Sequence, residues 1–286
     1  MHLNTKKLKT MKKLIVLLLI SIGVSALAQP AIKVEKTGKG IPVLFLPGFM
    51  TPGSVWTETV ANLKGKHEAH LVSYAGFNGN APIAMPWYST IKKELAEYVK
   101  TNKLKNLKLI GHSIGGNLAV DLAAELGDIV DKIIIVDALA CMREVMMPGV
   151  PAEALQYESP YNKQMIEMTD DAFLKSATMM AQGMTTVTEK QELIKSWILE
   201  ADRKTYVYGY TDLLKLDVRP TLTQIKVPVL ILGAPFPTKE IVLPNYEKQY
   251  ANLANKTLEI APAGRHYIMF DQPEWLYNQI NNFLTK

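Results

Sequence analysis

Ser113 has the clearest setting for nucleophilic chemistry in this sequence. It lies in the segment Gly111-His112-Ser113-Ile114-Gly115, which joins an apolar, strand-like run to a helix-like stretch. A serine in such a turn is strained and exposes its hydroxyl, and glycine at both second neighbours avoids a collision. The following helix also directs the positive end of its dipole at the reacting centre. We therefore predict a nucleophile at Ser113; the alternative is an ordinary strand-to-helix turn, since Gly-x-Ser-x-Gly is common by chance.

The elements that must position this serine alternate between strands and helices. Short apolar runs predict strands at residues 43–46, 70–74, 107–110, 132–136, 229–232 and 257–260. Helical patterns cover residues 90–100, 116–126 and 273–283. The strand run 133–136 lacks polar alternation, which is typical of strands covered on both faces. The sequence therefore predicts an α/β fold with a mostly parallel central sheet flanked by helices.

Residues 142–223 interrupt this alternation between two predicted core strands. The interval is helical in pattern, and it holds eight of the 13 methionines. Because a structureless loop of this length is improbable, we predict a helical cap inserted over the strand ends. Its methionines would either form a surface that adapts to varied apolar groups or pack the cap on the core. The core is then formed by residues 29–141 and 224–286.

From about residue 40 to residue 283, the sequence resembles the α/β-hydrolase superfamily, in particular its serine esterase and lipase-like branch with a helical cap. Besides the turn at Ser113, the segment Phe45-Leu46-Pro47-Gly48-Phe49 matches a loop that usually contains His-Gly. Proline replaces the histidine here. The resemblance implies an oxyanion hole formed by the backbone N–H groups of Phe49 and Ile114, which the proline need not remove. The alternative is that Pro47-Gly48 is only a turn.

The resemblance also places a catalytic base at His266. The segment Ala263-Gly264-Arg265-His266 follows the last predicted strand and precedes the final helix. A histidine has the near-neutral pKa needed to take the serine proton and return it to the leaving group. We expect structural roles for His112, in the variable position of the turn, and for His67 and His70, which flank a predicted strand.

The acid of the triad is the open question, because Phe236 occupies the position where most of the superfamily has an aspartate. Asp137 ends the strand 132–136, a position that carries the acid in some branches, and strand ends are where sites form. We predict that Asp137 orients His266; the alternatives are Glu240, no acid at all, or a purely structural Asp137. Asp271 or Gln272 is expected near the N-cap of the last helix, and this capping role is preferred for Asp271.

These residues predict an exported serine hydrolase that cleaves an ester of a small to medium uncharged substrate through an acyl-enzyme. The alternatives are the same apparatus acting on an amide, lactone, peracid or carbon–carbon bond, or a non-catalytic binding protein. We expect no cofactor. The scattered histidines and the single Cys141 give no metal-ligand spacing and no intramolecular disulfide. The oligomeric state is not predicted.

Residues 1–28 have the three parts of a secretory signal. Five lysines precede an apolar run over residues 14–24, and Ala26-Leu27-Ala28 has the small-x-small form of a cleavage site before Gln29. The alternative, a membrane anchor, requires about 20 apolar residues, and this run is shorter. Without these five lysines the chain has 27 basic and 27 acidic residues, so no nucleic-acid partner is expected. We predict export to a bacterial periplasm or medium, with no stable anchor after cleavage.

Overall fold

The central sheet has seven strands in the order β1-β3-β2-β4-β5-β6-β7. This computed structural model describes residues 29–285, so the predicted signal peptide lies outside the described residues. The predicted strands correspond to β2 (Ile41–Leu46), β3 (His67–Tyr74), β4 (Leu107–His112), β5 (Val130–Val136), β6 (Val229–Gly233) and β7 (Lys256–Ile260). These six strands pair in parallel, and the predicted mostly parallel sheet is confirmed.

The seventh strand, β1 (Ile32–Gly38), was not predicted. It forms the edge of the sheet and pairs antiparallel with β3 from Ile32↔Tyr74 to Gly38↔Glu68. Most of its residues are exposed, and Lys33, Glu35 and Lys36 give it no apolar run. Charged side chains are common on edge strands, where they oppose pairing with another chain.

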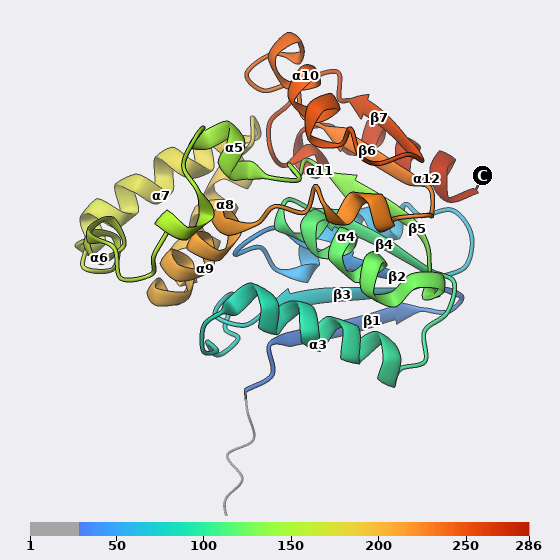
Figure 1. The fold of residues 1–286 in the computed structure, drawn as a ribbon, viewed down its shortest axis with the longest axis horizontal. Coiled ribbons are helices and arrows are strands. Elements are labelled where there is room, and N and C mark those ends of the chain that lie inside the picture. Colours follow the sequence, from blue (N-terminus) through green and yellow to red (C-terminus); the bar gives the residue numbers. More distant parts are fainter. Residues whose placement is uncertain (1–28, 286) are drawn as a thin grey trace, which may run out of the picture.

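Helices flank the sheet and follow the predicted ranges. In Figure 1, α3 (Trp87–Thr101) and α4 (Ile114–Leu126) lie in front of the sheet. The last helix, α12 (Pro273–Thr285), is joined to the segment after α2 (Thr57–Ala61) by Asn281, which bonds the backbone of Asn62 and Lys64. The short α11 (Ile268–Asp271) precedes α12, and α10 (Lys239–Gln249) joins β6 to β7.

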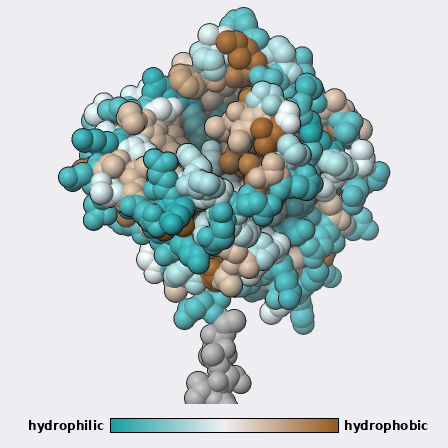
Figure 2. Space-filling model, turned by 60° about the vertical axis from the view of Figure 1, so that its left-hand side comes forward, coloured by the Kyte–Doolittle hydropathy of each residue, from teal (hydrophilic) through white to brown (hydrophobic). Residues whose placement is uncertain are grey.

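Between β5 and β6 the chain forms α5 (Met142–Met146), α6 (Pro160–Ile166), α7 (Asp170–Met184), α8 (Thr188–Glu200) and α9 (Arg203–Lys215). We use "cap" for residues 142–223. Figure 1 shows these helices gathered beyond the end of the sheet to which the parallel strands point. Figure 2 views this side of the molecule and shows apolar surface at the height of α10 and, below it, at the height of α5. Within residues 29–285, no helix combines the length and apolarity needed to cross a membrane.

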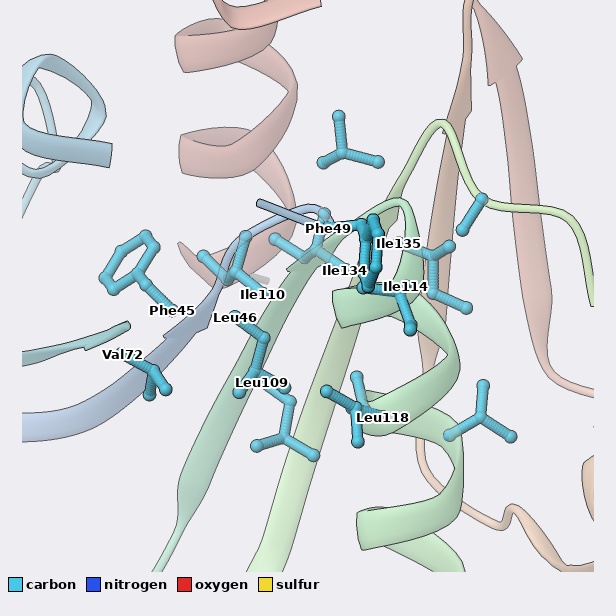
Figure 3. Packing of buried hydrophobic residues seen from close by; sticks show 14 of the residues in the cluster. Phe45, Leu46, Phe49, Val72, Leu109, Ile110, Ile114, Leu118, Ile134 and Ile135 are labelled. Carbon is cyan, nitrogen blue, oxygen red and sulfur yellow. The ribbon is translucent and has the colours of Figure 1, made fainter. Parts of the chain in front are cut away.

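The core fills the space between the parallel strands and α4. Figure 3 shows Leu109, Ile110, Ile134 and Ile135 on β4 and β5, with Leu118 of α4 packed nearby. All five side chains are fully buried. Since β4 and β5 lead directly into Ser113 and Asp137, this packing holds both residues at the same edge of the sheet.

Candidate active site

The turn at Ser113 has the strained backbone expected of an exposed nucleophile. Ser113 has φ 54° and ψ −126°, between β4 and the first residue of α4. Left-handed backbone in a non-glycine residue costs on the order of 1–3 kcal/mol and is found mostly at functional sites. A Cβ on Gly111 would lie 2.1 Å from the carbonyl oxygen of Gly115, and one on Gly115 would lie 2.2 Å from that of Leu46. Both glycines are therefore required by the close approach of the backbone.

Two backbone N–H groups lie beside this serine. Ile114 begins α4, so its N–H has no acceptor within the helix, and Phe49 follows β2 in the loop after Gly48. Among the described residues, no protein group accepts a hydrogen bond from either N–H. Figure 3 shows Ile114 at the start of α4 and Phe49 above the end of β2. The two predicted oxyanion donors are thus unoccupied and adjacent to Ser113.

Aromatic packing fixes the loop that carries Phe49. Its ring lies 4.8 Å from that of Phe77 and 5.5 Å from that of Trp87, centroid to centroid. On the cap side, a Cβ on Gly209 of α9 would lie 2.9 Å from the Phe49 ring. The Phe49 side chain is therefore held between core and cap, which limits movement of its N–H.

His266 and Asp137 are hydrogen-bonded to each other. Nδ1 of His266 lies 2.6 Å from Oδ2 of Asp137. Because a carboxylate only accepts, Nδ1 carries the proton and Nε2 is left with a lone pair. His266 and Ser113 line the same two cavities. The structure therefore brings together the predicted nucleophile, base and acid, together with the predicted oxyanion donors.

The second oxygen of Asp137 is also occupied. Oδ1 accepts the backbone N–H of Ala234 at 2.7 Å and the hydroxyl of Tyr246 at 2.7 Å. Burial alone would raise the pKa of Asp137, but the hydrogen bonds from His266, Ala234 and Tyr246 outweigh it, so this pKa lies below its usual value. Burial, with the nearby carboxylate, raises the pKa of Tyr246 well above its usual value, so the phenol keeps the proton that it donates. Asp137 is therefore held ionised in one orientation.

The loop that usually carries the acid has a different use in this chain. Phe236 is 51% exposed, and Ala234, two residues earlier, supplies its N–H to Asp137. Glu240 lies exposed in the first turn of α10, where Thr238 and its own backbone N–H lower its pKa. Of the two candidate acids, only Asp137 is hydrogen-bonded to His266 in the part of the chain that the structure describes.

His112 contacts the loop that carries His266. Its ring is fully buried, lies 4.5 Å from that of His266, and its Nε2–H donates to the backbone oxygen of His266 at 3.0 Å. Burial lowers the pKa of His112 to about 3, so the ring is neutral at physiological pH. The structural role predicted for His112 thus consists of a hydrogen bond to the backbone of His266, the residue expected to act as base.

Asp271 does not cap the last helix, and that prediction is wrong. Its carboxylate accepts hydrogen bonds from Thr185, Thr186 and the backbone N–H of Arg265. At the start of α12 it is the backbone oxygen of Gln272 that accepts, from Leu276. No local pattern in the sequence indicates these contacts, because Thr185 is 86 residues from Asp271.

The other histidines lie on β3. His67 bonds the backbone oxygen of Lys64 at 2.8 Å. Nδ1 of His70 bonds the Tyr98 hydroxyl at 2.7 Å, and its Nε2 lies 2.9 Å from the Glu68 carboxylate. Within residues 29–285, no group of three or more histidine, cysteine or acidic side chains is placed to hold a metal ion.

Comparison with known proteins assigns this chain to one family. The Alpha/beta hydrolase family matches residues 43–279. A pimeloyl-[acyl-carrier protein] methyl ester esterase of Aeromonas hydrophila is 26% identical over 210 residues, which cover 70% of this chain and 78% of the relative. The protein of that description from Wigglesworthia glossinidia brevipalpis is 25% identical over 251 residues, covering 86% and 94% of the two chains.

Solved structures agree on the fold. An esterase of Exiguobacterium antarcticum has a TM-score of 0.73 at 20% identity, covering 89% of this chain and 96% of the other. An enol-lactonase of Burkholderia xenovorans has a TM-score of 0.72 at 16% identity, with the same coverage of the two chains. This chain belongs to the α/β-hydrolase family, as predicted. Within that family it is an enzyme of the esterase type.

Proposed function

We propose that this chain is an exported serine esterase that uses Ser113, His266 and Asp137 as its catalytic triad. Nε2 of His266 takes the Ser113 proton while Oγ attacks the ester carbonyl carbon. The N–H groups of Phe49 and Ile114 stabilise the negative charge on the carbonyl oxygen. The carbon–alkoxide bond then breaks, and the alcohol leaves with the proton held by His266. In the second step His266 takes a proton from water, which attacks the carbonyl carbon of the acyl-serine. The bond to Ser113 Oγ then breaks, Oγ recovers the proton from His266, and the acid is released.

The observation that carries this proposal is the contact between His266 and Asp137. A general base for serine must present an unprotonated Nε2, and the 2.6 Å bond from Nδ1 to Asp137 selects that tautomer. Tyr246 and Ala234 supply the support that a catalytic carboxylate needs. A structural carboxylate at a strand end would need only the backbone contact.

The substrate class follows from the cavities around Ser113. Their apolar surface exceeds their polar surface, and Asp137, which is bonded to His266, is the one carboxylate among their described lining residues. Such surroundings favour a small to medium uncharged ester. Relatives are described as cleaving a methyl ester, which supports an ester of a small alcohol. The proposed reaction needs no cofactor, because side chains and backbone groups supply each proton and each charge contact.

Labelling by a fluorophosphonate probe, combined with a panel of substrates, tests the proposal. The protein should react covalently with the probe and hydrolyse simple alkyl esters faster than the matching amides and lactones. A protein that labels but prefers the lactones or amides would keep the triad and change the reaction. Absence of both labelling and turnover would contradict the proposal.

Export has a separate test. Expressed in a Gram-negative host, the protein should reach the periplasm with an N-terminus at Gln29, as read by mass spectrometry of the intact chain. A basic residue in place of the small residue at the cleavage site blocks processing, so Ala28→Arg should keep the leader attached. An intact leader on wild-type protein in the cytoplasm would refute export without affecting the esterase proposal.

A further inference from the structure

Two cavities meet at Ser113. Both are lined by Ser113, His266, Met142 and Leu213, and the rest of each lining consists of different residues. One lies against the oxyanion loop, with Gly48 and Phe49 in its wall, and the other lies against Ile114 and the loop after β6. An ester also extends in two directions from its carbonyl carbon, through the acyl chain and through the alcohol.

The first cavity lies between core and cap, and Tyr161 is the one described lining residue that is exposed. We name this cavity the methionine chamber for Met50, Met142, Met165, Met180 and Met184; its volume is about 400 Å³. Its walls include the buried side chains of Phe49, Tyr206 and Tyr267. Methionine side chains are flexible and polarizable, so they adapt to apolar groups of different length. Two roles were expected for the cap methionines. For Met142, Met165, Met180 and Met184, the lining of this chamber favours the first of them, an adaptable apolar surface.

The methionine chamber has no described charged side chain apart from the titratable His266. The amide nitrogen of Asn162, a polar lining residue, already donates to the oxygens of Gln156, Tyr157 and Thr211. A carboxylate at the far end of an acyl chain would lose water here without gaining a cation. Burial of an unpaired charge is strongly unfavourable, so the chamber suits an uncharged chain.

The second cavity has a more exposed lining. We name it the mouth chamber; its volume is about 270 Å³, and four large apolar side chains of its lining are exposed to solvent: Val145, Met146, Phe236 and Ile241. They belong to α5 and to the segment from the end of β6 into α10. Figure 2 shows apolar surface at the heights of α5 and α10. In the methionine chamber, by contrast, Tyr161 is the one large hydrophobic side chain of the described lining with comparable exposure.

We propose that the methionine chamber binds the acyl chain and the mouth chamber binds the alcohol. This assignment rests on the proposed function. The acyl group stays attached to Ser113 after the first step, so we assign it to the cavity with the more buried lining. The alcohol must leave and water must enter before the second step, so we assign both to the cavity whose lining is exposed to solvent. The substrate is thus an ester of an uncharged aliphatic acid.

Two bulky substitutions test the assignment. Ser176→Trp places an indole in the methionine chamber from α7, and Ile241→Trp places one in the mouth chamber from α10. Each variant is assayed with ethyl esters from acetate to decanoate, and with acetates from ethyl to decyl. Ser176→Trp should lower kcat/KM for the longest acyl chain, relative to that for acetyl, by roughly tenfold or more, because a change in how well a chain fits its pocket has an effect of this size. Ile241→Trp should do so only in the alcohol series.

The results separate the two proposals. Labelling and ester turnover by wild-type protein establish the esterase, and rates are taken per labelled serine so that partial misfolding has no effect. Three outcomes would overturn the chamber assignment alone: the reverse pattern, an effect of both variants on the same ester series, or no effect of either variant. Monoethyl sebacate should also be a poorer substrate than ethyl decanoate by roughly tenfold or more, because its far carboxylate would be unpaired. Equal rates would overturn the claim of an uncharged acyl chain.

A different observation concerns Asp271, which joins the cap to the loop of His266. One oxygen accepts hydrogen bonds from Thr185 Oγ1 at 2.6 Å, from the Thr186 N–H at 2.9 Å and from Thr186 Oγ1 at 3.0 Å. The other accepts the N–H of Arg265 at 2.6 Å. Gly264 closes against this carboxylate, since a Cβ there would lie 2.7 Å from that of Asp271.

Thr185 and Thr186 follow α7, whose last residue, Met184, lines the methionine chamber. The backbone oxygen of Met184 also accepts the N–H of Tyr267 at 3.0 Å, one residue after His266. We infer that Asp271 is a positioning residue, which holds His266 and the Met184 wall of the chamber in one fixed relation. If so, its loss should affect the chemical step and the binding of long acyl chains together.

Asp271→Asn tests this inference. An amide has one acceptor oxygen, so it can serve the threonines or the Arg265 N–H but not both. Per labelled serine, kcat should fall roughly tenfold because small displacements of a base are costly, and KM should rise for ethyl decanoate more than for ethyl acetate. Asp202→Asn is the matched control, since Asp202 accepts two bonds from Thr205 at the start of α9. A purely structural role would lower the labelled fraction only; unchanged kcat and KM per labelled serine would overturn the inference.

Discussion

Ser113→Ala is expected to abolish fluorophosphonate labelling and to lower ester turnover by on the order of 10⁴ to 10⁶-fold, as loss of a serine nucleophile does elsewhere. The oxyanion donors and the cavities remain in this variant, so residual activity should come from them alone. The thermal stability should change little. The hydroxyl faces the cavities, and alanine keeps the same Cβ in the same strained turn.

Ser89→Ala is the matched control for this prediction. Ser89 is exposed on α3, and its hydroxyl bonds only the backbone oxygen of Pro86, at 3.5 Å, within the described chain. The control should label and turn over esters as the wild-type protein does. Turnover by Ser113→Ala within about tenfold of wild type would contradict a nucleophilic role, because that factor corresponds to only ~1.4 kcal/mol of the barrier.

The sequence revealed the parallel strands because their physical signal is local. A strand covered by helices on both faces reads as an unbroken apolar run, and 133–136 and 229–232 have that form. The edge strand β1 lacks it, since the charged residues Lys33, Glu35 and Lys36 are exposed. Its pairing with β3 joins residues that are 30 to 42 positions apart in the sequence, which no local pattern encodes.

The site divided in the same way between local and distant features. The turn at Ser113 and the strand end at Asp137 could be predicted because a motif or a strand boundary marks each. Tyr246 was missed because it bonds Asp137 from 109 residues away, inside a helix with no sequence signal of its own. Asp271 was misassigned for a related reason. An acidic residue just before a helix is usually its N-cap, but Asp271 bonds Thr185, which lies in the cap (residues 142–223) and is distant in the sequence.

The second large effect is expected from Asp137→Asn, which should lower kcat roughly 10³ to 10⁴-fold while the protein stays folded. The reason lies in the two donors that already occupy Oδ1, the Ala234 N–H and the Tyr246 hydroxyl. They require an acceptor, so the amide must keep its oxygen there and turn its NH₂ toward His266. Nδ1 of His266 must then accept, its proton moves to Nε2, and Nε2 can no longer take the proton of Ser113.

Glu240→Gln is the control, because Glu240 is exposed and its side chain is engaged at the start of α10. It should leave kcat unchanged, whereas a large loss in Glu240→Gln with a small one in Asp137→Asn would move the acid to the loop after β6. Weak effects from both would mean that His266 works without a carboxylate. Nitrogen-15 chemical shifts of the His266 ring give an independent measurement: the wild-type protein should carry its ring proton on Nδ1 and Asp137→Asn on Nε2. The same tautomer in both proteins would remove the physical basis of this prediction even if the rate fell.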